Sequence, residues 1–340
     1  MQLIRFSARD IGVDLGTKYI LMTVKGDGII LREPSIIGVD KKTSVIVATG
    51  NDANDAFEKS PETIKIIRPL KDGVIADYTA TGKLISDMMA KVKNKYSVNK
   101  PRIVVGIPCG ITDVEKRAVI NVFLQAGAKE VYVVYEPLAA AIGAGMNVLR
   151  PVGRLVVDIG AGTTEVSSIS MGTILSNVSI KTGGNVIDDS IVEYLKSRKG
   201  IAISNSIAED LKKNIGCATP FLTELTQEIR ARNISTGNPE KFTISSKDIE
   251  AAMERPMRDI LNAIEKTLAN TSSTIVSDII ENGIVLTGGG AQIKNLDNFI
   301  AQYFKIKTII APDSADCVVK GTGKILENIE RYRVIFERDN

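Results

Sequence analysis

A glycine-rich turn between two apolar runs is the feature that most constrains how this chain can fold. In the segment LVVDIGAGTTEVSS an apolar run ends at Asp158, and an alternating run follows the glycines. This pattern predicts a β-hairpin entered from a buried strand. Because Gly160 and Gly162 lack a Cβ, their backbone N–H groups can approach an anion closely. The segment therefore predicts a phosphate-binding turn, with Asp158 near a hydrated Mg²⁺ and hydroxyls from Thr163 and Thr164.

The chain repeats this arrangement near its N-terminus. The segment IGVDLGT places Asp14 at the end of an apolar run, and Gly16 and Thr17 follow it. An Asp-Gly pair between the next two β-rich runs predicts a hairpin. Since Asp14 and Asp158 are 144 residues apart, about one domain, we expect two related halves. A single glycine-rich turn is often an ordinary turn, but the repetition favours two turns that hold the phosphates of one nucleotide.

Composition narrows the functions open to the chain. Its 340 residues suggest two domains, with 44% hydrophobic and 24% charged residues as in globular proteins. The net charge of +3 gives no nucleic-acid signal. Without histidine, catalytic triads and His-ligated metals are excluded. No apolar run approaches the roughly 20 residues that span a bilayer, and no signal peptide opens the chain, so we expect a cytoplasmic protein.

Several side chains are expected to be structural. The three cysteines at 109, 217 and 317 have no paired spacing and are expected to be small buried hydrophobes. Apolar residues between 84 and 92 recur at helical spacing. A solvated basic face is expected around the end of that helix. Its members are Lys91, Lys93, Lys95, Lys100 and Arg102.

Glu136 lies where a predicted strand changes to a helix. The strand covers 131–135, and Pro137 suits the first helical turn. Ligands of open α/β sheets bind at the carboxyl ends of strands, which favours a functional role. The alternative is an acid that stabilises the helix dipole. The preceding helix opens with a capping box at Thr112 and runs to about residue 126, with Val114 in its apolar stripe.

Two glycine clusters mark the second half. Gly183-Gly184 precedes a helix with Asp188 and Asp189 expected in its first turn, and such a helix start can bind a sugar or phosphate. Three glycines at 288–290 follow a strand, so backbone there can lie flat against adenine and ribose. A helix is expected to begin near Gln292.

These motifs together resemble the actin-like ATPases and, within them, the bacterial MreB cell-shape family. The resemblance covers nearly the whole chain, and strong use of Ile, Lys and Asn suggests a wall-less bacterium such as Spiroplasma. It implies an α/β, actin-like fold of two RNase-H-like domains, each with a smaller inserted subdomain and with the nucleotide in the interdomain cleft. The segments that carry it are ARDIGVDLGT, LREPSIIGVD, IRPLKDGVIADY, VEKRAV, YEPLAAAIGAG, VVDIGAGTTEV, GIVLTGGGAQIKNLD and KGTGK. The implied subdomains are IA (1–32, 67–150 and 312–340), IB (33–66), IIA (151–182 and 246–311) and IIB (183–245).

The resemblance also assigns the site. Glu136 positions the attacking water with help from Thr163, and Asp14 and Asp158 hold Mg²⁺ through water, which suits a cation that keeps its hydration shell. The ATP-binding residues are Asp14, Gly16, Thr17 and Lys18 in the first turn, Gly160, Ala161, Gly162, Thr163 and Thr164 in the second, and Gly183, Gly184, Glu209, Lys212, Gly288, Gly289 and Gly290 around ribose and adenine. Departures from the family pattern are Lys18-Tyr19, Ala161 for a glycine, and Asn214 for an acid.

The implied function is slow ATP hydrolysis coupled to polymerisation into filaments that determine cell shape. Other copies of the chain are the expected partner, with paired protofilaments meeting at the 112–126 helix, and nucleic acid is not a partner. Contact with the inner face of the membrane is expected through the N-terminal residues or through 329–340. A small-molecule kinase of the same fold and an ATP-binding scaffold with little hydrolysis are the alternatives.

Overall fold

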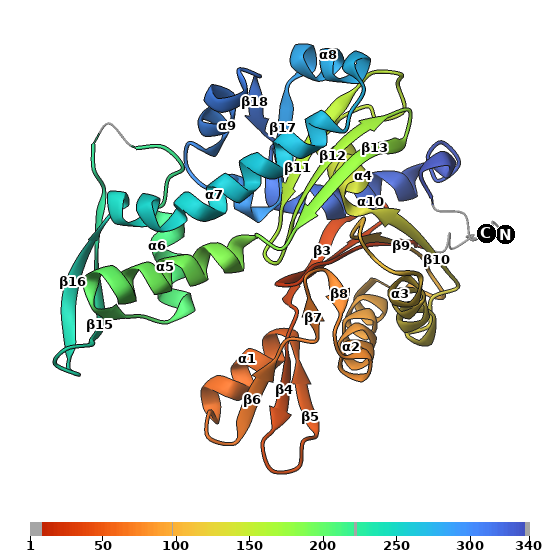
Figure 1. Cartoon of the computed structure of the whole chain (residues 1–340). Helices are drawn as coiled ribbons and strands as arrows, with labels where there is room; N and C mark the ends of the chain where they lie inside the picture. The colour runs from red at the N-terminus through yellow and green to blue at the C-terminus, as the bar shows by residue number, and fades with distance from the viewer. Residues whose placement is uncertain (1–8, 97, 221–222, 337–340) are drawn as a thin grey trace. The chain divides into compact units, whose positions relative to one another are not determined.

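The computed structural model describes residues 9–96, 98–220 and 223–336. The chain forms two compact units (Figure 1). Unit 1 contains the described residues up to Leu149 and from Asp316 onward, and unit 2 contains Arg150–Ala315. The further division of each unit into the subdomains expected above stays a prediction.

Unit 1 is built on a five-stranded sheet with the order β10-β9-β1-β2-β3. The first three strands form an antiparallel meander, and β9 and β10 run parallel to β1. The expected hairpin is present, because the Asp27 N–H donates to the Val24 carbonyl over 2.9 Å. The bounds are β1 (Ile11–Leu15), β2 (Tyr19–Val24), β3 (Gly28–Pro34), β9 (Arg102–Ile107) and β10 (Glu130–Tyr135).

Alternate residues of β1 face opposite sides of this sheet. Ile11, Val13 and Leu15 share a hydrophobic core with apolar residues of α2 and α3. On the other side, a Cβ at Gly12 would lie 2.6 Å from Thr322 Oγ1 of α10, so α10 packs directly on the β1 backbone. The helices of unit 1 are α2 (Tyr78–Tyr96), α3 (Asp113–Gln125), α4 (Glu136–Gly143) and α10 (Cys317–Glu327).

A second, smaller sheet is inserted between β3 and α2. It has the order β5-β4-β6, and α1 packs against all three strands. We call residues 37–67 the inserted sheet. A short hairpin, β7 with β8, returns the chain to α2. The bounds are β4 (Ile37–Asp40), β5 (Ile46–Thr49), α1 (Gly50–Lys59), β6 (Ile64–Ile67), β7 (Leu70–Lys71) and β8 (Val74–Ile75).

Unit 2 repeats the topology of unit 1, as the two similar segments predict. Its sheet has the order β13-β12-β11-β17-β18, again with an antiparallel meander followed by two parallel strands. The sheet strands are β11 (Arg154–Ile159), β12 (Thr164–Ser170), β13 (Thr173–Ile180), β17 (Ile284–Thr287) and β18 (Thr308–Ile310). The helices are α5 (Gly184–Lys199), α6 (Asn205–Ile215), α7 (Ser246–Ala269), α8 (Ser273–Asn282) and α9 (Leu296–Phe304). A further sheet contains β14 (Ile201–Ala202), β15 (Thr226–Asn233) and β16 (Pro239–Ser245).

Two expectations about helices in unit 2 are wrong, one about where a helix starts and one about which residues lie in a first turn. The helix expected near Gln292 begins at Leu296, because a 3-10 turn at 289–292 comes first and Asn295 takes a left-handed φ of +60°. The helix that follows Gly183 begins at once, with Gly184 as its first residue. Asp188 and Asp189 therefore lie beyond its first turn.

The expected apolar stripe of α3 is wrong at its first position. Val114 is 77% exposed, whereas Lys116 is buried with Val119 and Phe123. At about 100° per residue, Val114 is about 200° around the helix from Lys116, so it cannot share that face. The capping box at Thr112 is present.

The basic residues near the end of α2 are not simply a solvated face. Lys91 forms ion pairs with two carboxylates, Lys93 donates to the Ala126 carbonyl over 2.7 Å, and Arg102 pairs with buried Asp10 over 2.6 Å. Sequence spacing alone did not indicate these partners. Cys217 and Cys317 are buried as expected, and Cys109 is partly buried.

Two glycines set the distance between α4 and α10. A Cβ at Gly143 would lie 1.8 Å from the Cys317 carbonyl oxygen, and one at Gly321 would lie 1.8 Å from the Ala139 carbonyl oxygen. These helices therefore meet backbone to backbone, which only glycine permits.

We expect Gly321→Ala to lower the free energy of unfolding by about 1–3 kcal/mol, because the added methyl group overpacks this contact. Gly82→Ala in α2 is the matched control. No atom outside the local helix backbone lies within 4 Å of that Cβ position, so the higher helix propensity of alanine should stabilise the protein by about 0.5–1 kcal/mol. Denaturant titration followed by circular dichroism checks both values. Equal stability of the two variants would contradict the packing argument.

Candidate functional site

The first turn follows β1 and is compact. A Cβ at Gly16 would lie 2.7 Å from the Tyr19 carbonyl oxygen and 3.6 Å from Asp14 Oδ1. A side chain at position 16 would therefore clash with the Tyr19 carbonyl oxygen, whereas its contact with Asp14 would be an ordinary van der Waals contact. Asp14, Thr17 and Lys18 are half-buried at the end of this strand.

Hydrogen bonds from two other segments hold this turn. The buried Ser35 hydroxyl donates to the Gly16 carbonyl over 2.6 Å, and the Ser35 N–H donates to the Lys18 carbonyl over 2.9 Å. The Gly73 N–H, in the β7–β8 turn, donates to Thr17 Oγ1 over 3.0 Å. The sequence indicated neither Ser35 nor Gly73, because both contacts depend on tertiary folding.

Glu136 lies on the same side of the sheet as α10. It opens α4 directly after β10, and its Cγ lies 3.3 Å from a Cβ position built on Gly106. Gly106 of β9 pairs with Val134 of β10, and Val105 of β9 pairs with Val13 of β1. Asp14 and Glu136 are thus at the carboxyl ends of the parallel strands β1 and β10, which lie on either side of β9.

The second turn connects β11 and β12 as the predicted hairpin. The Gly160 N–H donates to the Thr163 carbonyl over 2.9 Å, and neither Gly160 nor Ala161 has a left-handed φ. Alanine is therefore tolerated at the position where the family pattern has glycine. Thr164 is fully buried and donates its hydroxyl to the Thr182 carbonyl over 2.5 Å. Its predicted contact with phosphate stays a prediction.

Asp158 is a buried carboxyl at the end of β11. It is 8% exposed, and its Oδ1 accepts a hydrogen bond from Thr287 Oγ1 over 2.7 Å. Burial raises the pKa of Asp158 above its ordinary value, and the Thr287 hydrogen bond offsets this in part. A nearby cation would favour the charged carboxylate, so this residue fits the predicted role beside hydrated Mg²⁺.

The start of α5 packs onto the second turn. The Gly184 N–H donates to the Gly160 carbonyl over 2.9 Å, and the Asn185 N–H donates to the Ala161 carbonyl over 2.8 Å. A Cβ at Gly183 would lie 2.7 Å from the Ala161 carbonyl oxygen. The glycine pair thus permits close packing, and these two helix N–H groups already have acceptors. Its contact with a sugar stays a prediction.

Lys212 of α6 reaches the same helix start. Its Nζ donates to the Gly184 carbonyl over 3.0 Å and pairs with Asp188 over 2.6 Å. Glu209, on the same helix, pairs with Lys213 over 2.6 Å. Lys212 therefore lies beside the second turn, and Asp188 holds it there, a role that the sequence did not reveal.

The glycine run after β17 packs against the end of β11. A Cβ at Gly288, where φ is +79°, would lie 2.3 Å from the Ile159 carbonyl oxygen, and one at Gly290 would lie 2.2 Å from Ile159 Cγ2. Gly289 has open space around its Cβ position. The three glycines thus lie beside the second turn, with one position free to approach a ligand.

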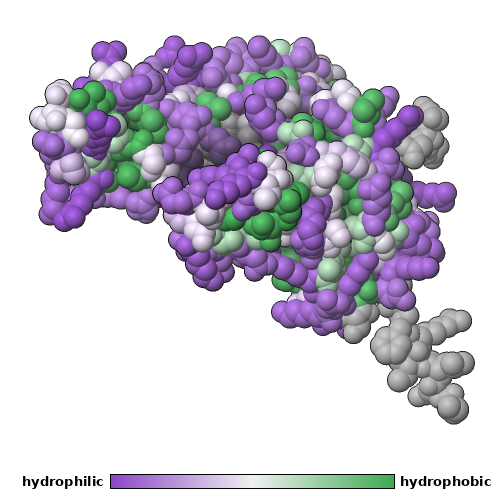
Figure 2. Space-filling view, turned by 90° about the horizontal axis from the view of Figure 1, so that it is seen from below, coloured by the Kyte–Doolittle hydropathy of each residue, from purple (hydrophilic) through white to green (hydrophobic). Residues whose placement is uncertain are grey.

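Membrane contact stays a prediction. In the tail, Ile335 is buried and the Phe336 ring packs 5.1 Å from the Tyr132 ring, whereas Val334 is 61% exposed. Residues 1–8 and 337–340 lie outside the described residues. Among the residues described, no helix is long and apolar enough to cross a membrane. The face in Figure 2 is mostly hydrophilic, with small apolar patches between the polar groups.

Replacing Asp158 by asparagine should stabilise the nucleotide-free protein at neutral pH. A raised carboxyl pKa gives stability that is present below the ordinary value of 3.8 and is lost as pH rises through the folded-state value. Asparagine keeps the acceptor for Thr287 and removes the buried charge. We expect the Tm of Asp158→Asn to exceed that of the wild type by a few degrees at neutral pH, with a smaller gain in mild acid. Thermal melts at both pH values check this, and a lower Tm at neutral pH would contradict it.

Comparison with known proteins identifies the family. The family model for the MreB/Mbl protein matches residues 8–334. The chain is 39% identical to the cell shape-determining protein Mbl of Bacillus subtilis over 95% of this chain and 97% of that protein. It is 40% identical to the cell shape-determining protein MreB of Escherichia coli over 96% and 95%.

Solved structures agree with this result. MreB5 of Spiroplasma citri bound to ADP superposes with a TM-score of 0.90 and 36% identity over 96% of this chain and 99% of that chain. The same protein bound to AMPPNP superposes with a TM-score of 0.89 and 35% identity over 96% and 98%. The fold is therefore actin-like, and the chain belongs to the MreB/Mbl family.

Proposed function

We propose that this chain binds ATP with Mg²⁺, hydrolyses it slowly and polymerises into filaments that determine cell shape. One observation carries the proposal: two sheets of the same strand order each lead from their first strand into a glycine turn that follows an aspartate, Asp14 or Asp158. Family membership supports it, because relatives at about 40% identity carry cell-shape names.

The two turns are proposed to bind the phosphates of the same ATP. Support comes from MreB5, which has been solved with ADP and with AMPPNP. In unit 2, Gly160–Thr164, Gly183–Gly184, Lys212 and 288–290 all gather around the end of β11. Turn N–H groups suit phosphate oxygens, and the Lys212 ammonium adds positive charge.

Asp14 and Asp158 are the proposed holders of Mg²⁺, through water. When bound, the ion would neutralise charge on the phosphates. Glu136 is proposed to accept a hydrogen bond from the attacking water and to orient it, with Thr163 assisting. Hydrolysis of a phosphoanhydride depends on positioning and on charge neutralisation, so this chemistry needs no histidine.

Glu136→Ala should retain ATP binding and lose hydrolysis by about 100-fold or more, because the water loses its orienting base. Glu130→Ala is the matched control. Glu130 lies at the other end of β10, where its carboxylate accepts a hydrogen bond from the Tyr132 hydroxyl. Phosphate release measures hydrolysis, and fluorescent-nucleotide titration measures binding. Unchanged phosphate release from Glu136→Ala would overturn the assignment.

Polymerisation is tested on the wild-type chain. We expect light scattering and negative-stain microscopy to detect filaments with ATP and Mg²⁺, and kinases of this fold should give none. ATP binding without filaments at any salt or lipid condition would contradict the cytoskeletal function. In that case transfer of the γ-phosphoryl group to small hydroxyl compounds would be the next assay.

A further inference from the structure

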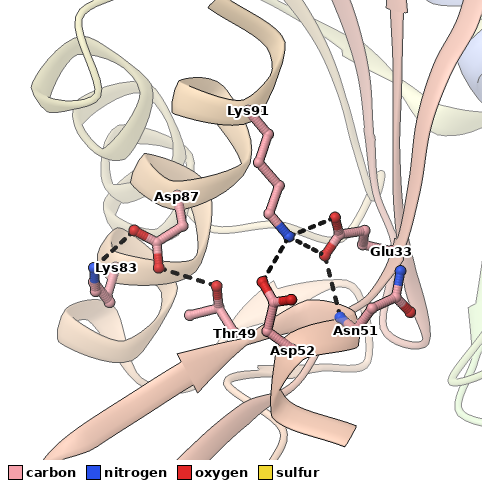
Figure 3. Close-up of polar contacts among 7 residues, drawn as sticks. All are labelled: Glu33, Thr49, Asn51, Asp52, Lys83, Asp87 and Lys91. Atoms are coloured by element: carbon pink, nitrogen blue, oxygen red, sulfur yellow. Dashed lines mark hydrogen bonds and ion pairs between the residues drawn. The ribbon is translucent and has the colours of Figure 1, made fainter. Parts of the chain in front are cut away.

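The end of β3 carries a polar cluster that the proposed chemistry does not use. Glu33 is 8% exposed and accepts hydrogen bonds from Lys91 Nζ over 2.8 and 3.1 Å. It also accepts the Asn51 N–H of α1 over 3.2 Å, and Lys91 donates to Asp52 over 3.0 Å. Figure 3 shows Lys91 of α2 pointing between Glu33 and Asp52. The cluster therefore joins β3, α2 and the inserted sheet.

The residues of this cluster are tightly packed. Gly50 has a φ of +59°, and a Cβ there would lie 1.9 Å from Glu33 Oε2. Burial lowers the pKa of Lys91, but its hydrogen bonds to Glu33 and Asp52 outweigh this and hold the pKa above its ordinary value. A carboxylate this buried is costly unless it is paired, so Glu33 depends on these partners.

Ser35 connects the same strand end to the first turn. It is fully buried, and its hydroxyl and N–H donate to the carbonyls of Gly16 and Lys18. Only Pro34 separates Ser35 from Glu33, and the proline ring fixes φ at about −65°. The backbone between Ser35 and Glu33 therefore has little conformational freedom.

We propose that Ser35 and Glu33 are positioning residues that couple the first phosphate turn to the inserted sheet through Lys91 and Asp52. Phosphate at the turn shifts the Gly16 and Lys18 carbonyls, and the cluster carries that shift into α1. This inference rests on the proposed nucleotide binding, since the turn must bind phosphate for the coupling to act.

Amide hydrogen exchange measured by mass spectrometry tests the coupling on unpolymerised full-length protein, with and without AMPPNP and Mg²⁺. In the wild type we expect nucleotide to slow exchange across residues 37–67. In Lys91→Met this nucleotide-dependent difference should fall by at least half, while nucleotide affinity changes little. In Ser35→Ala the difference should fall by at least half at saturating nucleotide, which allows for a weaker affinity because Ser35 also holds the turn. Lys91→Met is the sharper variant, because Lys91 makes no hydrogen bond to the turn among those described.

Matched variants separate coupling from folding. Lys95→Met makes the same change on the same helix, but the Lys95 Nζ lies over the Tyr96 ring of its own helix, 5.4 Å from the ring centroid, so the full difference should remain. Lys91→Arg keeps the charge and should restore most of the difference. Thermal melts confirm that each variant is folded.

Three outcomes overturn the proposal. If the wild type binds nucleotide and exchange in 37–67 does not change, or if folded Lys91→Met keeps the wild-type difference, the coupling is wrong and the proposed function stands. If the wild type binds no adenine nucleotide, the proposed function fails and the coupling falls with it.

Discussion

Parallel pairing between the first and fourth strands of each sheet is the interaction on which the candidate site depends. In unit 2 it aligns Asp158 with Thr287, and in unit 1 it brings the end of β1 beside β9. A slip of one residue would turn each aspartate to the opposite face of its sheet. The strand register therefore decides whether each carboxylate lies on the face of the sheet that carries the candidate site or on the face that packs into the hydrophobic core.

Close backbone packing then fixes the second turn. Gly183 and Gly288 allow neighbouring segments to approach it where a Cβ would clash with carbonyl oxygens. The N–H groups at the start of α5 donate hydrogen bonds to backbone carbonyls of the turn itself. The turn is thus held in shape before any ligand arrives, and a preorganised site loses less entropy on binding.

Polar contacts attach the inserted sheet to the rest of unit 1. Besides the Glu33 cluster, Thr49 donates to Asp87 of α2 over 3.0 Å. Hydrogen-bonded ion pairs are directional, so they specify one orientation in a way that apolar contacts do not. This kind of attachment suits a part whose position must respond to the first turn.

The sequence by itself determined the repeated hairpins, the α/β class and the family, because alternating apolar runs, glycine turns and their order are local or pairwise patterns. It also located Asp14, Asp158 and Glu136 at strand ends, where they are found. Tertiary structure alone decided which groups contact the residues of the candidate site. Thr287 donates to Asp158, Asp188 pairs with Lys212, and Ser35 donates to the Gly16 carbonyl. The members of these three pairs are 129, 24 and 19 residues apart in the sequence, respectively. Strand register and helix packing bring them together, and neither is encoded in residue spacing along one segment.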